Sequence, residues 1–283
     1  MKFNSRWPKR PVYWTERDTL YISVPFTWNM PRIKAQLQSK LNPWKKTLIG
    51  GPGAYLTLFH YPEYLAGLPV EVRGNYPGVL QRINPLATRA TTGCVHFCRF
   101  CGIGQGIIEP GGFKEFDDWP DLPVYVDNNV LAASESQFDM IMARLERHGW
   151  GDFEQGLDAR LLTEYHAERF ARVKKLVIRL ALDTMVYKMA WEEAYENLRR
   201  AGIGKQRIRS YALIGFDSSP DEAWARCQYI EKLGVDALPM WYHRLNAMDF
   251  NKVTKEQEEL GWNDYERRRI MQWYYHHKEA VKR

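Results

Sequence analysis

The stretch Cys94-Val95-His96-Phe97-Cys98-Arg99-Phe100-Cys101 places three of the chain's four cysteines on one short loop. Iron–sulfur clusters are held by cysteine thiolates, and thiolates separated by three and then two residues can wrap a cube of iron and sulfide. Three protein ligands for a four-iron cluster leave one iron without a side chain. The loop therefore predicts a [4Fe-4S] cluster held by Cys94, Cys98 and Cys101, with one iron open to a small molecule.

Three other interpretations of this loop are weighed against the cluster. A structural zinc site takes four ligands, and His96 could complete one, although its position between Cys94 and Cys98 strains a tetrahedral arrangement. A ferredoxin-like electron carrier needs a fourth cysteine, and the remaining one, Cys227, falls in a helical stretch at 220–233 where an inert core thiol is expected. Three exposed thiols in a purely structural protein would be a chemical liability without a metal.

The bulk composition is that of a globular chain. Its 283 residues, 45% of them hydrophobic, suffice for one large core plus a small appended region. The longest apolar runs, such as 176–178 and 212–214, are far shorter than the ~20 residues of a membrane span. Residues 1–14 lack the apolar stretch of a secretory signal, and clustered thiols suit a reducing compartment. We therefore expect a cytoplasmic protein that does not associate with a membrane.

Positive charge gathers at the two ends of the chain, whose formal net charge is +6. The basic residues at these ends are Lys2, Arg6, Lys9 and Arg10, then Arg267-Arg268-Arg269, Lys278, Lys282 and Arg283. This pattern fits an anionic partner such as a nucleic acid, and it fits solvated basic termini equally well.

After the cysteine loop, strand-like and helix-like patterns alternate along the chain. Strands are expected at 124–126, 153–157, 176–182, 210–214 and 237–241, and helices at 136–148, 163–172, 187–201 and 220–233. Repeating β-α units of this kind predict an α/β protein with a parallel sheet, either open or curled into a partial barrel.

The N-terminal region, 1–74, has a β-α-β pattern of its own, with a strand at 19–25, a helix at 31–41 and a strand at 47–49. Gly50-Gly51-Pro52-Gly53 follows this last strand. The run is not a G-x-G-x-x-G motif, and Pro52 removes a backbone donor from any phosphate cradle. We interpret it as a turn that does not bind a nucleotide.

The C-terminal region, 251–283, follows a core region at 75–250 and contains a basic, aromatic helix that begins near the capping residue Asn263. Its aromatic residues and Ile270 alternate with arginines. The aromatics could stack on bases. Alternatively, the helix is amphipathic and packs on the core with its arginines in water.

The cysteine loop resembles the signature of the radical S-adenosylmethionine (SAM) superfamily, which has these spacings and an aromatic residue, here Phe100, before the last cysteine. The resemblance covers about 75–242 and implies a partial (β/α)6 TIM-like barrel, with a half-Rossmann-like N-terminal region and a C-terminal helix. It implies that SAM chelates the open iron, is cleaved reductively to a 5′-deoxyadenosyl radical, and so abstracts hydrogen from a substrate. A reductase or a flavodoxin-type protein would supply the electron.

The resemblance also implies where the cofactor contacts lie, without naming a catalytic residue. Strand ends would meet the SAM amine at Asp127-Asn128-Asn129, the ribose at Asp183-Thr184 after Arg179, and the adenine at Gly215-Phe216-Asp217. Further contacts are expected from Phe100 and Gly102 beside the cluster, and from Gln155, Asp158 and Arg160 at the third strand. Capping or turn roles are the alternative for the polar residues of this set.

The N-terminal layout, with Tyr76-Pro77 and Thr91-Thr92-Gly93, is similar to that of cobalamin-dependent members of the superfamily. The chain has no Asp-x-His-x-x-Gly run to ligate cobalt from below, so bound cobalamin is not expected. Its compact size, basic ends and aromatic tail resemble bacteriophage radical SAM proteins, some of which modify bases in DNA. We expect a nucleobase in DNA or RNA as the substrate. The first alternative is a small metabolite or peptide, and the second is a non-catalytic, metal-stabilised nucleic-acid-binding module.

Overall fold

A computed structural model describes residues 7–39, 44–72 and 78–281. The chain divides into two compact units, one made of Met1–Ala87, His96–Gly112 and His243–Phe250, the other of Thr88–Val95, Phe113–Tyr242 and Asn251–Arg283. Several sequence predictions lie outside the described residues: the boundary between 74 and 75, Tyr76-Pro77, and the basic residues Lys2, Arg6, Lys282 and Arg283. The division of the chain at 74 and 250 stays a prediction.

The second unit is built on a six-stranded sheet with the order β12-β11-β10-β9-β8-β5. Its strands are β5 (Ala87–Thr88), β8 (Val124–Tyr125), β9 (Trp150–Phe153), β10 (Lys175–Ala181), β11 (Ile208–Ile214) and β12 (Asp236–Trp241). All pairs from β8 to β12 are parallel. This confirms the predicted α/β class with a parallel sheet. β5 and β12 form the ends of the sheet, and the described strands do not close into a barrel.

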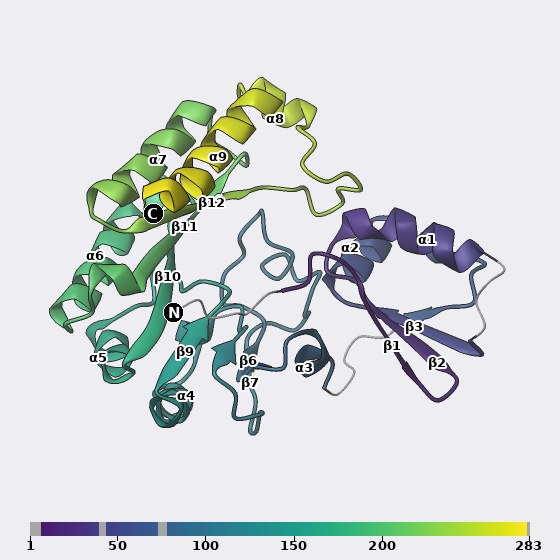
Figure 1. Ribbon diagram of the computed structural model, residues 1–283, viewed down its shortest axis with the longest axis horizontal. Helices are drawn as coiled ribbons and strands as arrows, with labels where there is room; N and C mark the ends of the chain where they lie inside the picture. Colours follow the sequence, from purple (N-terminus) through teal and green to yellow (C-terminus); the bar gives the residue numbers. More distant parts are fainter. Residues whose placement is uncertain (1–6, 40–43, 73–77, 282–283) are drawn as a thin grey trace. The chain divides into compact units, whose positions relative to one another are not determined.

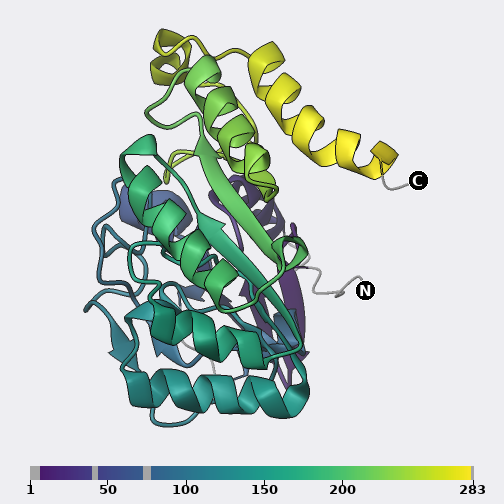
Figure 2. The same ribbon diagram turned by 90° about the vertical axis from the view of Figure 1, so that its left-hand side faces the viewer.

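Four helices alternate with these strands: α4 (Glu135–His148), α5 (Glu164–Arg172), α6 (Lys188–Arg200) and α7 (Pro220–Lys232). They lie side by side along one face of the sheet (Figures 1 and 2). Local signals define their ends. Ser134 accepts a hydrogen bond from the Gln137 N–H at the start of α4, and Gly149 ends that helix in the left-handed region. Each of these helices follows the carboxyl end of a strand in the chain, so a loop at that edge of the sheet precedes each helix.

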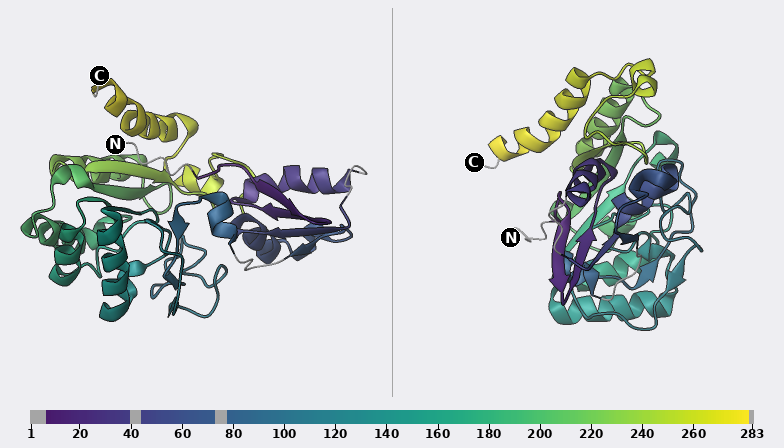
Figure 3. Two further views of the ribbon diagram at one scale, coloured as in Figure 1. Left: turned by 60° about the horizontal axis from the view of Figure 1, so that its bottom comes forward. Right: turned by 90° about the vertical axis from the view of Figure 1, so that its right-hand side faces the viewer.

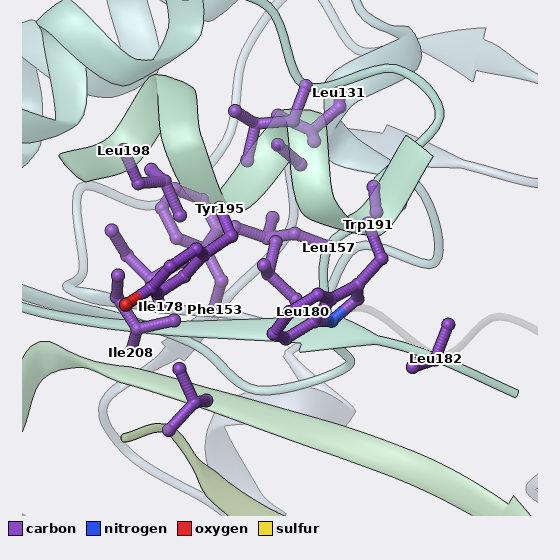
Figure 4. Close-up of a cluster of buried hydrophobic side chains, with 14 of the residues drawn as sticks. Leu131, Phe153, Leu157, Ile178, Leu180, Leu182, Trp191, Tyr195, Leu198 and Ile208 are labelled. Carbon is purple, nitrogen blue, oxygen red and sulfur yellow. The ribbon is translucent and has the colours of Figure 1, made fainter. Parts of the chain in front are cut away.

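The core of the second unit lies between this sheet and its helices, as Figure 4 shows around α6 and β10. Trp191 and Tyr195 of α6 stack with ring centroids 5.6 Å apart, and Trp191 Nε1 donates to Ser210 Oγ at 2.9 Å. Large aromatic side chains contribute much of the burial energy of such a core. Cys227 of α7 is fully buried in the same core, as expected for an inert thiol.

The third strand of the second unit is placed differently from the prediction. The sequence predicts a strand at 153–157, whereas β9 spans Trp150–Phe153. Gly151 packs closely against the preceding helix, since a Cβ there would lie 2.7 Å from the end of the Leu145 side chain. Gly156 has a φ of +90°, which interrupts extended backbone. The polar residues after Phe153 therefore belong to the loop at the carboxyl end of β9.

Two more helices, α8 (Lys255–Glu259) and α9 (Asp264–Val281), complete the second unit. The buried side chains of Ile270 and Tyr274 join its core. Two arginines of α9 lie over indole rings, Arg267 over Trp241 and Arg269 over Trp224. These contacts support the packing interpretation of the helix. No helix within the described ranges is long and apolar enough to cross a membrane.

The first unit has a four-stranded sheet in the order β1-β2-β3-β4. Its first strands are drawn in purple in Figure 3. Its elements are β1 (Val12–Glu16), β2 (Thr19–Ser23), α1 (Met30–Gln38), β3 (Lys46–Gly50), α2 (Pro52–His60) and β4 (Glu71–Val72). β2, β3 and β4 are parallel, which confirms the predicted β-α-β pattern, and β1 adds a hairpin partner that the sequence analysis missed. The short strands β6 (Thr91–Thr92) and β7 (Lys114–Glu115) pair separately, and α3 spans Val79–Ile83.

The glycine-rich run forms the junction between β3 and α2, with Pro52 as the first helical residue. Gly51 has a φ of +91°. A Cβ at Gly53 would lie 2.4 Å from the backbone carbon of Phe26, and the Gly53 N–H donates to the Val24 carbonyl at 2.9 Å. The glycines are therefore required by the close approach of the unit's own backbone.

This geometry predicts that Gly53→Ala destabilises the first unit by about 2 kcal/mol, because backbone atoms leave no room for the methyl group. Chemical denaturation of the whole protein, together with hydrogen exchange of the α2 amides, measures this loss of stability. Gly67→Ala is the matched control: its φ of +74° imposes strain, but nothing lies within 4 Å of its Cβ position. A smaller loss for Gly53→Ala than for Gly67→Ala would contradict the steric explanation.

A ring stack attaches a distant segment of the chain to the first unit. Trp28 lies 4.5 Å from the ring of His243, and His243 stacks on Phe250 at 5.4 Å with an interplanar angle of 10°. Thr27 Oγ1 donates to the Ala247 carbonyl beside these rings. Residues 243–250 therefore belong to the N-terminal fold although they follow β12 in sequence.

Candidate cofactor site at the carboxyl edge of the sheet

Polar residues follow several neighbouring parallel strands of the second unit. Asp127 comes two positions after β8, Asp158 lies in the loop after β9, and Asp183 comes two positions after β10. Parallel strands place their carboxyl ends at one edge of a sheet, which is where open α/β sheets bind their ligands. This edge is therefore the candidate site.

Asp127 is a buried carboxylate. One of its oxygens accepts hydrogen bonds, and the other has no hydrogen-bond partner among the described residues. Its Oδ1 accepts hydrogen bonds from the Ala90 N–H at 2.9 Å, the Thr91 N–H at 2.5 Å and Thr91 Oγ1 at 2.7 Å. Its buried Oδ2 accepts no hydrogen bond from the described part of the chain. Burial raises the pKa of Asp127 to about 6, and the Thr91 hydrogen bonds and the charge of Arg89 limit that rise.

Asn129 joins the first cysteine to the polar edge within the second unit. Its side chain is 3% exposed, and Nδ2 donates to Cys94 Sγ at 3.5 Å and to Asp158 Oδ2 at 3.4 Å. Arg160 holds Asp158 with two hydrogen bonds of 2.8 Å and lies over the ring of Tyr187. A continuous chain of contacts therefore runs from the Cys94 sulfur to Tyr187, which is 38% exposed.

Asp183 is the second carboxyl group at this edge with an altered affinity for protons. Its Oδ1 accepts a hydrogen bond from the Leu213 N–H at 3.2 Å, which connects the ends of β10 and β11. Desolvation raises the pKa of Asp183 to about 6, while the charges of Arg226 and Arg160 lower it. Asp127 and Asp183 thus both have a raised pKa at the carboxyl edge of the sheet, and perturbed pKa values cluster at functional sites.

Arg179 lies in β10, and its donors are directed to the neighbouring strand. Its guanidinium pairs with the buried carboxylate of Asp152, donates to the Phe153 carbonyl at 3.2 Å and lies 3.5 Å from Glu154 Oε2. Burial lowers the pKa of Arg179. The side chain thus connects β9 to β10 beside the candidate site, and its contact with SAM stays a prediction.

The three clustered cysteines lie where the chain passes from one unit to the other: Cys94 belongs to the second unit, and Cys98 and Cys101 belong to the first. All three are half-buried, and none of the four cysteines is in a disulfide. The Cys101 N–H donates to the Cys98 carbonyl at 3.0 Å, which forms a tight turn. Within residues 7–39, 44–72 and 78–281, no set of three or more His, Cys, Asp or Glu side chains is placed to hold a metal ion.

The remaining predicted residues occupy varied environments. Phe100 and Asn128 are half-buried, and Gln155 is exposed. Gly102 is buried, and its carbonyl accepts the N–H groups of Ile107 and Ile108. Gly215 has a φ of +79°, and its carbonyl accepts a hydrogen bond from Gln257 Nε2 at 2.7 Å.

Sequence reasoning missed three residues that shape this edge. Thr91 holds Asp127, Tyr187 lies under Arg160, and Gln257 of α8 donates to the Gly215 and Tyr242 carbonyls. The run Thr91-Thr92-Gly93 directly before the first cysteine was a usable signal for Thr91. Gln257 carried no such signal, because its partners lie 42 and 15 positions away.

The donor chemistry of these residues fits an iron–sulfur cluster and a polar ligand beside it. Thiolates are the ligands that such clusters take. The buried Asp127 Oδ2 and Asn129 Oδ1 accept no hydrogen bond from described residues, so both suit a ligand that carries N–H or O–H groups.

The raised pKa of Asp127 predicts a pH dependence of stability. The folded state keeps this proton up to about pH 6, whereas an unfolded Asp loses it near pH 3.9, so stability falls as the pH rises between these values. Asp127→Asn keeps the Oδ1 acceptor without the charge. At pH 7.5 the variant is expected to be more stable than the wild type by on the order of 2–3 kcal/mol, and near pH 4 to match it.

Urea unfolding of both proteins between pH 4 and pH 8 measures this difference. A variant that loses the same stability at every pH would show that the hydrogen bonds, rather than the desolvated charge, dominate at this position.

Comparisons with known proteins bear on the fold. No protein-family model matches the chain, and no curated protein matches it. Among solved structures, its fold is similar to that of a radical SAM methyltransferase. That protein is TsrM from Kitasatospora setae, whose structure has cobalamin and a [4Fe-4S] cluster bound. The TM-score is 0.50 at 12% sequence identity over 77% of this chain and 60% of that chain. This chain thus spans less than two thirds of TsrM, and the likeness is one of fold.

Proposed function

We propose that this protein is a radical SAM enzyme. In this proposal Cys94, Cys98 and Cys101 hold a [4Fe-4S] cluster, and SAM binds along the carboxyl edge of the parallel sheet. The sequential strand order and the helices on one face support a partial (β/α)6 barrel for this core. When bound, the cluster supplies the electron that cleaves SAM to methionine and the 5′-deoxyadenosyl radical, which abstracts hydrogen from the substrate.

One observation carries the proposal: Cys94, the first ligand of the motif, accepts a hydrogen bond from Asn129 at the same edge that carries Asp127. A ligand that chelates an iron beside Cys94 would thus lie near acceptors at the end of β8. Asp127 Oδ2 and Asn129 Oδ1 would accept hydrogen bonds from its amine, and Asp183 would accept one from its ribose hydroxyls. The likeness of fold to a radical SAM methyltransferase adds support.

We do not propose that this chain binds cobalamin, although the structure of TsrM contains it. The chain has no Asp-x-His-x-x-Gly run. The close approach of Gly51 and Gly53 to the backbone of Val24 and Phe26 accounts for these glycines without a ligand.

For the substrate we propose a nucleobase in DNA or RNA, on the ground of the net charge of +6 and the basic ends. Arg267 and Arg269 contribute little to that charge pattern, because they lie in ion pairs with Asp264 and Glu266. Arg268 is exposed and suits an anionic partner better. A small metabolite or peptide is the alternative substrate, and a non-catalytic nucleic-acid-binding module the second alternative. An oxygen-sensitive cluster and its electron donor, a reductase or flavodoxin, would suit the reducing cytoplasm.

Anaerobic reconstitution tests the enzyme proposal. About four irons per chain and 5′-deoxyadenosine formed from SAM and a reductant are expected. One zinc per chain without SAM cleavage would favour the binding module instead.

Nucleic-acid binding at several salt concentrations tests the substrate class. Affinity for single-stranded DNA or RNA should fall steeply as the salt concentration rises. In a plot of log affinity against log salt concentration, Arg268→Gln should reduce the slope by the amount that corresponds to about one phosphate contact. Absence of salt-dependent binding would favour the small-molecule substrate.

A further inference from the structure

The Asn129 amide has a defined orientation because both neighbours of its Nδ2 are hydrogen-bond acceptors. These are Cys94 Sγ at 3.5 Å and Asp158 Oδ2 at 3.4 Å. A flipped amide would turn Oδ1 toward the Asp158 carboxylate, with repulsion there, and also toward a thiolate when Cys94 ligates iron. The amide nitrogen therefore points one N–H at the Cys94 sulfur.

A second set of contacts holds this donor in place. Asp158 receives the Arg160 guanidinium through two hydrogen bonds of 2.8 Å and the Arg160 backbone N–H at 3.1 Å. Arg160 in turn lies 4.5 Å from the centroid of the Tyr187 ring. With 3% of its surface exposed, Asn129 has little freedom to turn away from the sulfur.

We propose that Asn129 is a positioning residue that donates a hydrogen bond to the Cys94 thiolate and thereby raises the reduction potential of the cluster. This inference rests on the proposed function, which places a cluster on this thiolate. Reduction adds an electron whose negative charge is spread over the cluster sulfurs, and a donor aimed at one of these sulfurs stabilises the reduced form. Asp158 and Arg160 act on the potential indirectly, because they fix the direction of the amide.

Two variants remove the donor in different ways. Asn129→Leu removes the polar group without adding charge, and Asn129→Asp keeps the shape of the side chain but replaces Nδ2 by an oxygen and adds a negative charge that also lowers the potential. Asn197→Leu is the matched control, since Asn197 is also a buried amide, 4% exposed, whose Nδ2 donates to the Leu162 carbonyl in a part of the core remote in sequence.

The measurement is an anaerobic redox titration of the reconstituted cluster without SAM, in which electron paramagnetic resonance quantifies the reduced cluster at each potential. At a fixed applied potential, both Asn129 variants should contain about tenfold less reduced cluster relative to oxidised cluster than the wild type. For a one-electron couple this corresponds to a potential about 59 mV more negative. Arg160→Gln should shift the potential in the same direction by a smaller amount, and Asn197→Leu should titrate as the wild type does.

The outcomes separate this inference from the proposed function. A wild-type chain that assembles no four-iron cluster defeats the proposed function itself. Asn129 variants that contain four irons and titrate at the wild-type potential overturn the inference and leave the enzyme proposal standing. Loss of the cluster from both variants, with wild-type circular dichroism and melting, also overturns it, because a donor that only adjusts the potential is dispensable for assembly. If Asn129→Leu fails to fold, Asn129→Asp still tests the inference, because a wild-type potential in a variant that has lost the donor and gained a negative charge would overturn it.

Discussion

Replacing any one of Cys94, Cys98 or Cys101 by alanine is expected to reduce SAM cleavage by more than about 100-fold. Substitution of residues that only hydrogen-bond to a metal ligand typically costs 10–100-fold in metal affinity or activity, and these variants would remove one of the proposed ligands. The chain has no spare thiol near the loop in sequence, since the fourth cysteine comes 126 positions after Cys101. Iron content, absorbance near 400 nm and 5′-deoxyadenosine formation measure the loss.

Cys227→Ala is the control for these variants. This thiol is fully buried in the core of the second unit, so its removal is expected to lower the melting temperature while leaving iron content and SAM cleavage near wild-type values. Loss of the cluster from a folded Cys227→Ala protein would mean that the cluster has four protein ligands and no open iron, and the SAM proposal would fail with it.

The Arg179→Leu variant is expected to lose about 3–5 kcal/mol of unfolding free energy. This change leaves the Asp152 carboxylate, only 1% exposed, without the guanidinium that compensates its burial. The pair joins β9 to β10 in the middle of the parallel sheet, so the second unit should lose stability as a whole. Urea unfolding monitored by tryptophan fluorescence measures the change.

The double variant Asp152→Leu plus Arg179→Leu distinguishes a structural role from a cofactor contact. Replacing both partners of a buried ion pair by hydrophobic residues is often neutral, so the double variant should regain most of the lost stability. If instead Arg179→Leu unfolds like the wild type but binds SAM weakly, the arginine serves the cofactor and the ion pair is secondary.

The helices of the second unit were predictable because their signals are local. Ser219 and Glu222 form a capping box directly before and within α7, and Pro220 occupies the first turn. The strand β9 was misplaced because the backbone of Gly156, with a φ of +90°, interrupts the expected strand, while Gly151, within β9, packs against Leu145 of the preceding helix. A pattern of residue types contains no record of such a contact.

Parts of the candidate site were likewise predictable from the sequence, and other parts were not. The spacing of the cysteines is visible in the sequence, and the polar strand ends follow from the superfamily resemblance. What the sequence could not supply is the pairing: Asp127 takes its hydrogen bonds from Thr91, 36 positions earlier, and Asn129 donates to a sulfur 35 positions earlier. Arg179 shows the same limit, since the sequence does not reveal that its guanidinium pairs with Asp152 of the neighbouring strand.

The ring stack that joins Trp28 to His243 also sets an order of events on the ribosome. In the second unit each strand from β9 to β12 pairs with the strand translated just before it, so the sheet can grow as the nascent chain emerges. The N-terminal fold cannot be completed in the same stepwise way, because its residues 243–250 emerge only after β12. The N-terminal fold, which is translated first, therefore stays incomplete until every strand of the second unit has been made, and Trp28 meets the ring of His243 only then; of the helices and strands, only α8 and α9 of the second unit are translated later.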